Sequence, residues 1–431
     1  MRVAIADLRA ACSRLANNPA IMWLAAGLGG IAIHILLWQV SEPPDTFSDF
    51  YKAYWPAAEY LYEDGLSAAW PLTEKGGFSN LPIFGWLFVP LVPLGEETAA
   101  WTYLAIGLVA LLGAWALLTW FARLTAPFAA ILLFLFLVNG PVLNSLREGQ
   151  STHFILLLLV VALSLWRAKL ECAAGAVLGV CAMIKLPLLL YCAYFLLRQR
   201  WRIVAGGAMS MTVIGLLSLS LFGVAGHLGW YAEWVAPFLH TAIPAFNVQS
   251  IDGFLIRLAA QVTDLRDWEP REPSLAHRIA RLGTFAVMFG GSYWVLRRAA
   301  GSRPRVPGSS GASARDLLEF ALVLILALIT SPVSWTHYYL FILLPWGLYL
   351  GGRLPLSDDA ATRWLMSIGY ALAAMPVIMP AEVAPSWPAA ILARTLVSAW
   401  LCGGLLIFVA LVRGVWRAEM RAVEILRGEQ R

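Results

Sequence analysis

The sequence predicts an all-α, polytopic membrane protein, because it is strongly apolar, poor in charge and arranged in long hydrophobic stretches. Of its 431 residues, 60% are hydrophobic and 13% are charged, whereas soluble domains carry about 25% charged residues. A membrane-spanning helix needs roughly 20 mainly apolar residues, and stretches of that kind follow one another along the chain. No segment has the composition of a soluble domain, so we expect one transmembrane domain over residues 1–431.

About twelve stretches have the length and composition of a spanning helix. They cover residues 20–40, 81–95, 98–122, 126–142, 150–166, 171–197, 203–223, 280–296, 316–333, 335–351, 363–380 and 389–412. The second stretch is short and contains Pro82, Pro90 and Pro93, which predicts a tilted, broken or re-entrant segment. The sixth has Lys185 and Pro187 near its middle, which predicts two half-helices.

Clusters of arginine predict the orientation in the membrane. They lie before the first span, after the sixth, after the eighth and in the tail. Short loops rich in Lys and Arg remain cytoplasmic, so we expect both termini, the 297–315 linker and the 413–431 tail on that side. Residues 1–19 are typical of a basic amphipathic segment on the inner surface. Arg123 and the pair Arg167 and Lys169 are exceptions, because twelve spans place them outside.

Two large loops, residues 41–80 and 224–279, are then expected on the non-cytoplasmic side. Each contains an aromatic stretch compatible with a helix, around residues 50–62 and 228–239. Tryptophan and tyrosine are enriched at the level of the lipid headgroups. The two stretches therefore predict helices that lie in the membrane interface.

Several classes of function find no support in the sequence. No GxxxxGK[ST] or GxGxxG motif precedes a helix, which weighs against nucleotide binding. The five cysteines form no CxxC pair, which argues against a zinc site or a disulfide framework. The positive residues behind the net charge of +5 lie mostly in short loops, so we expect membrane lipids and no nucleic acid as partners.

Asp49 is the first candidate for a functional residue. It follows the first hydrophobic span, and charged groups at the edge of a bilayer often mark a reaction or transport path. An Asp before an aromatic run also makes a good helix N-cap. Both interpretations of Asp49 are open from its position alone.

Further polar residues are expected on the same outer side. His337 follows the ninth span, and the second large loop supplies Asn247, Gln249, Ser250 and Arg257. A carboxylate can accept a hydroxyl proton, and a cation can hold a phosphate leaving group. Group transfer to a hydroxyl is therefore possible.

Ordinary roles remain open for the same side chains. His337 beside a tryptophan is also typical of an interfacial residue. Arg257 is also suited to anchoring on lipid headgroups, and Lys185 to snorkelling or pairing with a buried partner.

Short motifs follow one another in a characteristic order. They are Asp49-Phe50, Tyr54-Trp55-Pro56-Ala57-Ala58 with Gly65, Phe78 with Pro82 and Pro90-Leu91-Val92-Pro93-Leu94, Gly149-Gln150, Ala174-Gly175-Ala176-Val177-Leu178-Gly179, Lys185-Leu186-Pro187, Asn247-Val248-Gln249-Ser250 and Ser331-Pro332-Val333-Ser334-Trp335-Thr336-His337. In order and spacing they resemble glycosyltransferase family 87, the polyprenol-phosphate-mannose-dependent alpha-mannosyltransferase type with the GT-C membrane fold. The resemblance runs from about Phe47 to about Pro345. The chain departs from the family where Asn80-Leu81-Pro82 replaces Tyr-Pro-Pro and where one residue is inserted in Asn-Gln-Ser.

The resemblance implies an enzyme that transfers a hexose, with mannose expected first, from a polyprenyl-phosphate donor to a hydroxyl of a lipid or glycan. It implies an inverting displacement with Asp49 as base, no metal and no cofactor besides the lipid-linked donor. The predicted catalytic residues are Asp49 and His337; the predicted donor or phosphate ligands are Arg257, Lys185, Gln249 and Ser250; the predicted substrate-lining residues are Tyr54, Trp335, Ser334 and Asn247. The site is expected to face the periplasm or exterior of the inner (plasma) membrane.

Two alternatives to this function remain at the level of sequence. A GT-C enzyme could transfer another lipid-linked sugar, such as arabinose, aminoarabinose or glucose. A lipid or polyprenyl-sugar transporter would instead need no chemistry. Transporters of that kind often contain internal repeats and broken helices that meet at the midplane, and the sequence has no clear repeat.

Overall fold

The computed structural model describes residues 18–40, 46–63, 65, 78–259, 265–301, 312–357, 359–376 and 387–428. Every regular element within them is a helix, and the two β-bridges, Ala242 with Arg271 and Val248 with Trp335, are isolated. The predicted all-α class is therefore confirmed. The predicted segment 1–19 lies almost wholly outside the described residues, as do parts of the 41–80 loop, the 297–315 linker and the end of the tail.

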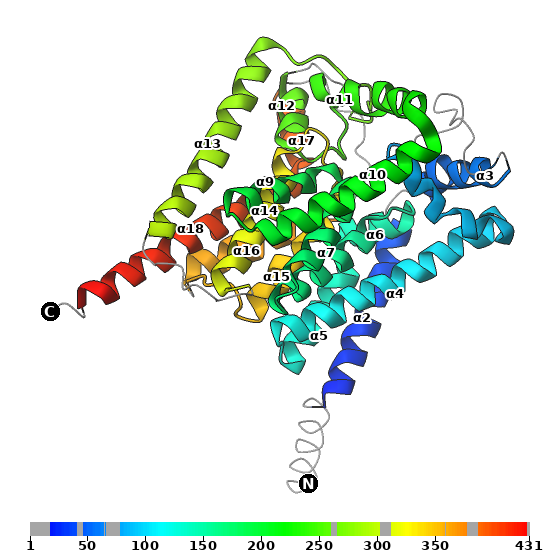
Figure 1. The fold of residues 1–431 in the computed structure, drawn as a ribbon. Coiled ribbons are helices and arrows are strands. Elements are labelled where there is room, and N and C mark those ends of the chain that lie inside the picture. The colour runs from blue at the N-terminus through cyan, green and yellow to red at the C-terminus, as the bar shows by residue number, and fades with distance from the viewer. Residues whose placement is uncertain are drawn as a thin grey trace, which may run out of the picture.

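Helices make up most of the described residues. In chain order they are α2 (Pro19–Val40), η1 (Phe50–Tyr54), α3 (Trp55–Glu63), η2 (Pro82–Leu87), η3 (Val89–Leu94), α4 (Glu96–Ala122), α5 (Ala126–Val138), α6 (Gly140–Arg147), α7 (Thr152–Arg167), α8 (Glu171–Ile184), η4 (Leu186–Leu189), α9 (Leu190–Leu197), α10 (Trp201–Trp230), η5 (Tyr231–Val235), α11 (Ala236–His240), α12 (Ile251–Ala259), α13 (Leu275–Gly301), α14 (Ala314–Thr330), η6 (Thr336–Ile342), α15 (Leu343–Leu350), α16 (Ala360–Ala373), α17 (Trp387–Leu396) and α18 (Ala399–Gly428). Figure 1 shows their arrangement.

The predicted count of about twelve spans is not confirmed. By length and composition, three of the described helices can cross a membrane: Pro19–Leu37, Glu96–Ala122 and Trp201–His240. The helices α5 and α6, bent by 51° at their junction, make a possible fourth span. Four of the other predicted stretches contain shorter apolar helices, at Pro82–Leu94, Thr152–Arg167, Glu171–Ile184 with Leu186–Leu197, and Ala399–Gly414.

Three interruptions of the helices lie at or close to a proline or a glycine. The proline-rich second stretch forms the two 3₁₀ helices η2 and η3. The sixth stretch divides at Lys185, whose backbone is extended between α8 and η4. The predicted span 203–223 ends at Gly223, where a φ of 64° kinks α10 before the helix continues.

The two expected interfacial stretches are helical in the structure. The first forms η1 and α3, and the second is covered by the end of α10, by η5 and by α11. Whether these helices lie in the membrane interface stays a prediction.

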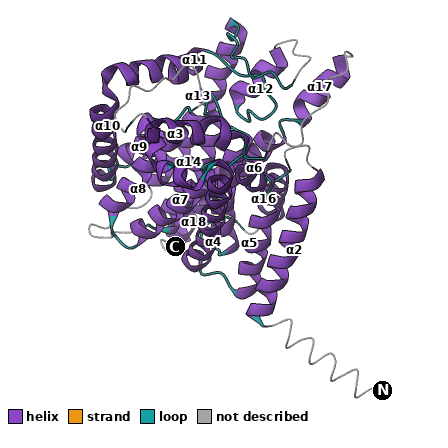
Figure 2. Cartoon of the chain, turned by 90° about the vertical axis from the view of Figure 1, so that its right-hand side faces the viewer, coloured by secondary structure: helices purple, strands orange, loops and turns teal. Residues whose placement is uncertain are grey.

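The centre of the bundle is formed by α14, which is buried along nearly its whole length, and by η6 and α15. Around it pack α9, α12 and α18, while α2 lies beside α5 at the periphery (Figure 2). The helices α8 and α10 approach most closely at Gly175 and Gly206, where a Cβ atom would meet backbone oxygens at 1.9 Å. Small residues of this kind let helices pack closely within a membrane.

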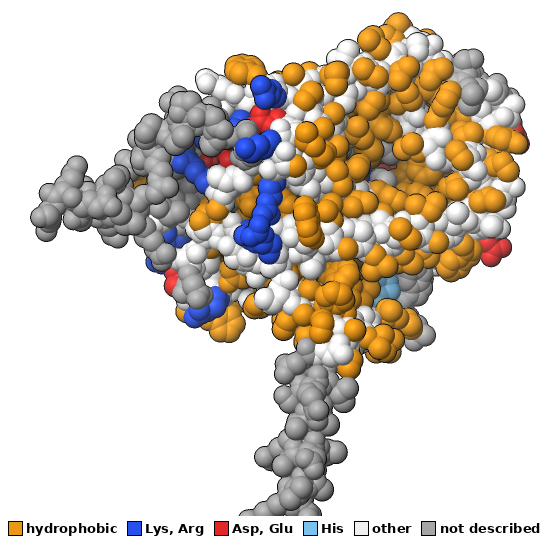
Figure 3. Space-filling view, turned by 60° about the horizontal axis from the view of Figure 1, so that its bottom comes forward, with side chains coloured by type: hydrophobic (Ala, Val, Ile, Leu, Met, Phe, Trp, Pro, Cys, Tyr) orange, Lys and Arg blue, Asp and Glu red, His pale blue; other side chains and the backbone are white. Residues whose placement is uncertain are grey.

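The outer surface is rich in apolar side chains. Large leucine, isoleucine and tryptophan side chains are exposed on α2, α4, α10 and α13. Figure 3 shows apolar side chains over most of one face, with Lys and Arg gathered at one side of it. Because soluble monomers rarely expose contiguous apolar areas of this extent, the surface is that of a membrane protein.

Candidate active site

A cavity of about 1480 Å³ lies among η1, α6, the break between α8 and η4, the end of α10 and the segment that precedes η6. One part of its wall carries polar side chains, namely Asp49, Lys52, Tyr54, Asn80, Asn144, Arg147, Glu148, Gln150, Lys185, Asn247 and His337. The rest of the wall is mainly apolar and includes Met183, Ile184, Leu186, Leu189, Leu190, Trp230, Trp234, Val235, Phe238 and Leu239. The cavity therefore combines a polar end with an apolar groove.

Asp49 belongs to the polar end and does not act as a helix cap. It precedes η1, but its side chain makes no capping hydrogen bond. The carboxylate instead accepts a hydrogen bond from Nε2 of Gln150. Burial raises the pKa of Asp49 above its usual value, while the Gln150 hydrogen bond and the charge of Lys185 partly lower it. The side chain is thus placed for chemistry in the cavity.

The turn between α6 and α7 holds the start of η1 in place. The carbonyl oxygen of Glu148 accepts hydrogen bonds from the amides of Asp49 (3.0 Å) and Phe50 (3.2 Å). Gly149 has a φ of +72°, and a Cβ atom there would lie 2.7 Å from Cβ of Phe50. Only glycine tolerates both the backbone conformation and the close approach. This explains the glycine of the Gly149-Gln150 motif.

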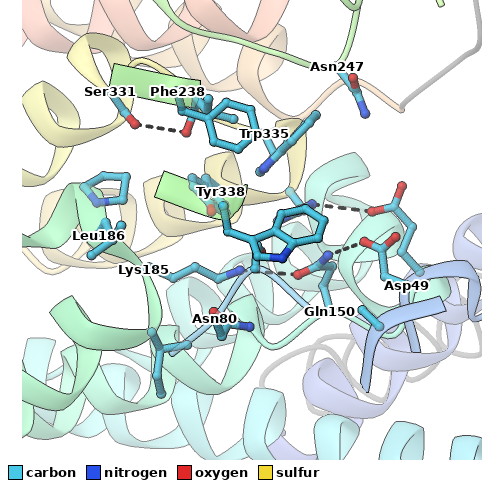
Figure 4. Close-up of a pocket in the computed structure, with 18 of the residues that line it drawn as sticks. Asp49, Asn80, Gln150, Lys185, Leu186, Phe238, Asn247, Ser331, Trp335 and Tyr338 are labelled. Atoms are coloured by element: carbon cyan, nitrogen blue, oxygen red, sulfur yellow. Dashed lines mark hydrogen bonds and ion pairs between the residues drawn. The ribbon is translucent and has the colours of Figure 1, made fainter. Parts of the chain in front are cut away.

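Gln150 links three polar side chains, as Figure 4 shows in part. Its Nε2 donates to Asp49, while its Oε1 accepts from Nζ of Lys185 (3.3 Å) and from the hydroxyl of Tyr54 (3.2 Å). Burial raises the pKa of Tyr54 to about 12, so its hydroxyl remains a donor at neutral pH. Gln150 therefore fixes the positions of the carboxylate and the ammonium group relative to each other.

Lys185 reaches the cavity from the break in the predicted sixth span. It is buried, and its Nζ lies 4.8 Å from the centroid of the Tyr338 ring. A cation over an aromatic face is stabilised by the ring quadrupole. The predicted helix break thus places a buried cation opposite Asp49 and Gln150.

His337 lies buried in η6 and also lines the cavity. Its Nδ1 is 3.4 Å from Oε2 of Glu148, while its Nε2 has no hydrogen-bond partner among the described residues. Burial raises the pKa of Glu148 well above its usual value, and the nearby Asp49 raises it further. Asp49 and Glu148 are thus two carboxyl groups within one polar pocket.

Arg257 is not in the cavity, in contrast to its predicted role. Its guanidinium is fully buried and donates to the carbonyls of Ala245 and Val248 (both 2.8 Å) and to the hydroxyl of Ser398 (2.9 Å). These bonds hold the 245–248 loop against the start of α18. Its Nη1 and Nη2 groups are thus used by loop carbonyls and a hydroxyl, and phosphate binding by Arg257 stays a prediction that this packing does not support.

Gln249 and Ser250 also lie outside the cavity wall and hold the backbone together. Nε2 of Gln249 donates to the carbonyls of Phe246 and Val397, and the Ser250 hydroxyl donates to the carbonyl of Pro332. Their predicted contacts with the donor stay predictions, although neither residue lines the cavity. Their side chains satisfy backbone groups of neighbouring segments.

The last two predicted motifs are paired with each other. The bridge between Val248 and Trp335 is flanked by hydrogen bonds from Gln249 N to Ser334 O (2.6 Å) and from Thr336 N to the carbonyl of Asn247 (2.9 Å). Pairing of the two segments positions His337 and the Trp335 indole at the cavity.

Of the predicted lining residues, three line the cavity and one does not. Tyr54, Trp335 and Asn247 belong to the wall, and Asn247 accepts a hydrogen bond from the indole of Trp268. Ser334 is buried outside the wall, and its contact with substrate stays a prediction.

Sequence reasoning missed Glu148, although a signal for it was present. Glu148 is an acidic residue next to the Gly149-Gln150 motif, between two apolar stretches. Lys52, Asn144 and Arg147 also line the polar end and were not predicted. No group of three or more metal-binding side chains occurs within the part of the chain that the structure describes.

Comparison with known proteins agrees with the motifs. Residues 78–314, more than half of the chain, match the model of glycosyltransferase family 87. A polyprenol-phosphate-mannose-dependent alpha-(1-2)-phosphatidylinositol mannoside mannosyltransferase of Mycobacterium tuberculosis is 25% identical over 348 residues, which are 75% of this chain and 74% of the relative. No solved structure shows a significant match. The chain therefore belongs to glycosyltransferase family 87 and is a membrane glycosyltransferase.

Proposed function

We propose that this enzyme transfers mannose from a polyprenyl-phosphate donor to a hydroxyl of a lipid or glycan acceptor, with Asp49 as the general base. The observation that carries the proposal is the cavity itself. A partly buried carboxylate, a buried lysine and a buried histidine share its polar end, and an apolar groove continues from that end. A sugar phosphate attached to a long hydrocarbon chain has the same division into a polar and an apolar part.

The apolar groove fits the hydrocarbon tail of the donor. Leu186 and Leu239 line it and are about half exposed, so the groove reaches the apolar outer surface of the bundle. Leu186 and Phe238 lie away from Asp49 in the close-up of the cavity (Figure 4). A lipid tail could enter from the side while its headgroup lies at the polar end.

Lys185 and His337 are the proposed ligands of the donor phosphate. Both line the polar end, and a lysine ammonium is a common point-charge partner of phosphate. His337 Nε2 lacks a hydrogen-bond partner within the described residues, so it is available to a ligand. Together they replace Arg257 in this role.

Asp49 is the proposed base for a single inverting displacement. The acceptor oxygen forms a bond to the anomeric carbon as the bond from that carbon to the phosphate oxygen breaks. The hydroxyl proton goes to Asp49, and the bonding electrons leave with polyprenyl phosphate. A phosphate departs readily, so no acid is required, and a β-linked donor yields an α-linked product.

Mannose as the sugar is supported by the relative from Mycobacterium tuberculosis, which is a polyprenol-phosphate-mannose-dependent enzyme. The proposed location is the plasma membrane, with the cavity on the non-cytoplasmic side. Support for this orientation comes from the arginine clusters, because loops rich in Lys and Arg remain in the cytoplasm. The proposal includes no nucleotide and no metal.

The test is transfer by the purified protein. It is incubated with separate mannosyl, glucosyl and arabinosyl polyprenyl phosphates and a membrane lipid extract, and products are identified by mass. We expect one added hexose on a lipid with the mannosyl donor, and no product with the Asp49→Asn variant. Product with another donor alone would change the assigned sugar, and absence of product with every donor would refute the proposal.

A further inference from the structure

Glu148 contacts both groups that the proposed function uses for catalysis. Its backbone carbonyl accepts hydrogen bonds from the amides of Asp49 and Phe50. Its carboxyl group lies 3.4 Å from Nδ1 of His337 and also takes part in a hydrogen bond with Asn144. No other described residue is paired with His337 by an ion pair or a side-chain hydrogen bond. Glu148 is therefore the polar partner that orients the His337 ring, which also packs edge-on against Tyr338.

The opposite nitrogen of the His337 ring points to a ligand. Nε2 is buried and has no hydrogen-bond partner among the described residues, although the residue lines the cavity. An unsatisfied buried polar atom costs roughly 1–3 kcal/mol. Such an atom in the wall of a cavity is typical of a site where a bound molecule supplies the missing partner.

The position of one proton decides what Nε2 can bind. If Glu148 carries the proton, it donates to Nδ1, and the neutral ring has its own hydrogen on Nε2. If the proton moves to the ring, both nitrogens carry hydrogens and the carboxylate accepts from Nδ1. In both cases Nε2 presents an N–H group to the cavity. The raised pKa of Glu148 is consistent with a proton retained at neutral pH.

We propose that Glu148 is a positioning residue that shares one proton with Nδ1 of His337 and so directs an Nε2–H donor at the donor phosphate. A negatively charged phosphate would draw the proton onto the ring and strengthen the bond. The separation of 3.4 Å exceeds an ordinary hydrogen bond, and such contacts often tighten when the ligand binds. This inference rests on the proposed function only for the identity of the ligand.

The decisive variants are Glu148→Gln, His337→Gln and the double variant. Glutamine at position 148 keeps the size of the side chain but cannot share a proton. Its amide can donate a hydrogen bond to Nδ1 but cannot release the proton, so the ring stays neutral and the Nε2–H group lacks the positive charge that strengthens its bond to phosphate. We expect His337→Gln to bind a short-chain polyprenyl phosphate roughly 10–100-fold more weakly, as for a lost hydrogen bond to a charged group, and Glu148→Gln to bind it more weakly than the wild type but by a smaller factor.

The affinity of the double variant shows whether Glu148 acts through His337 or binds the phosphate directly. If Glu148 acts through His337, the double variant binds polyprenyl phosphate no more weakly than His337→Gln alone. The inference would be overturned if the double variant lost affinity by the product of the two single losses, or if Glu148→Gln bound with normal affinity. Glu148→Asp retains a carboxyl group and should recover part of the affinity. Glu97→Gln, an exposed acid on α4 outside the cavity, is the matched control and should change nothing.

A spectroscopic measurement gives an independent readout of the tautomer. In protein labelled with ¹⁵N-histidine and saturated with polyprenyl phosphate, both ring nitrogens of His337 should be protonated in the wild type, whereas Nδ1 should stay unprotonated in Glu148→Gln. An Nδ1 signal that is the same in both proteins would overturn the inference. Because binding and tautomer need no turnover, a wild type that binds polyprenyl phosphate without transferring sugar would refute only the proposed function. A wild type that fails to bind polyprenyl phosphate would refute both.

Discussion

The molecule contains two clusters of buried charge that differ in how completely the charges are paired. At the start of α14, Glu319 pairs with Arg198 and Arg315 and accepts a hydrogen bond from Tyr194. Asp316 in the same turn pairs with both Arg198 and Arg200 and completes a capping box. In the cavity, Asp49 and Lys185 meet only through the amide of Gln150.

The difference indicates what each cluster does. Paired charges at α14 tie the turn between α9 and α10 to the central helix, which is a structural role. In the cavity, His337 Nε2 lacks a partner within the described residues, and burial raises the pKa values of Asp49 and Glu148. Perturbed groups in a cleft are typical of functional sites. Substitutions in the two clusters should therefore have different consequences.

The largest effect on activity is expected for Asp49→Asn. Asparagine keeps the size of the side chain but cannot accept the acceptor proton, and loss of a general base costs roughly 10²–10⁴-fold in rate. We expect the variant to fold and to bind polyprenyl phosphate normally, as checked by a monodisperse elution profile and a binding titration. Turnover close to that of the wild type would remove Asp49 from the mechanism.

A substitution in the paired cluster at the start of α14 should lower the stability of the protein. Glu319→Leu leaves Arg198 and Arg315 without their buried partner, and breaking a buried ion pair costs about 3–5 kcal/mol. Since both arginines are partly exposed to water, we expect the lower end of that range. Thermal unfolding in detergent measures the loss, while transfer by the folded fraction should be retained. A stable but inactive Glu319→Leu protein would contradict the structural role.

Lys185→Met should weaken donor use with a smaller effect than Asp49→Asn. Loss of a charged hydrogen-bond donor to phosphate should raise the donor KM roughly 10–100-fold, with the acceptor KM little changed. Arg257→Ala is the informative comparison, because the Arg257 guanidinium lies outside the cavity and donates to backbone carbonyls there. We expect that variant to lose stability and to keep its donor KM. A donor-specific defect in Arg257→Ala alone would reverse the two assignments.

The smallest expected effect is a displacement of the pH profile. Asp49 acts as a base only when deprotonated, so activity should increase as pH rises through its pKa. Burial raises that pKa above the usual value of about 3.9, and the acidic limb of kcat should therefore lie above about pH 4. Lys185→Met removes a charge that lowers the pKa of Asp49, so its limb should move to higher pH. A limb that stays at the same pH would show that Asp49 does not produce it.

The sequence predicted the helical class and several cavity residues because these depend on local properties. Asp49, Lys185 and His337 were identifiable as polar residues beside apolar spans or breaks. Arg257 had the same appearance, but the loop carbonyls that occupy its guanidinium lie 9 and 12 positions away along the chain. Only the folded chain determines which polar side chains face a cavity and which satisfy the backbone.

The number of membrane spans could not be predicted from the sequence for a related reason. Hydropathy detects apolar stretches, but it does not determine where a helix ends within one. The chain breaks at Lys185 and kinks at Gly223 and at the junction of α5 and α6. Glu148 was missed because its importance comes from the turn that brings it to Asp49 and His337, which are distant in sequence.

The most direct test of the proposed site is a cryo-electron microscopy structure of the Asp49→Asn variant with an intact mannosyl polyprenyl phosphate. The substitution should allow binding and block transfer, so the donor should remain whole. We expect the phosphate within hydrogen-bond distance of Lys185 Nζ and His337 Nε2, the anomeric carbon facing position 49, and the tail along Leu186 and Phe238. A donor phosphate bound outside this cavity, or a sugar turned away from position 49, would contradict the assignment.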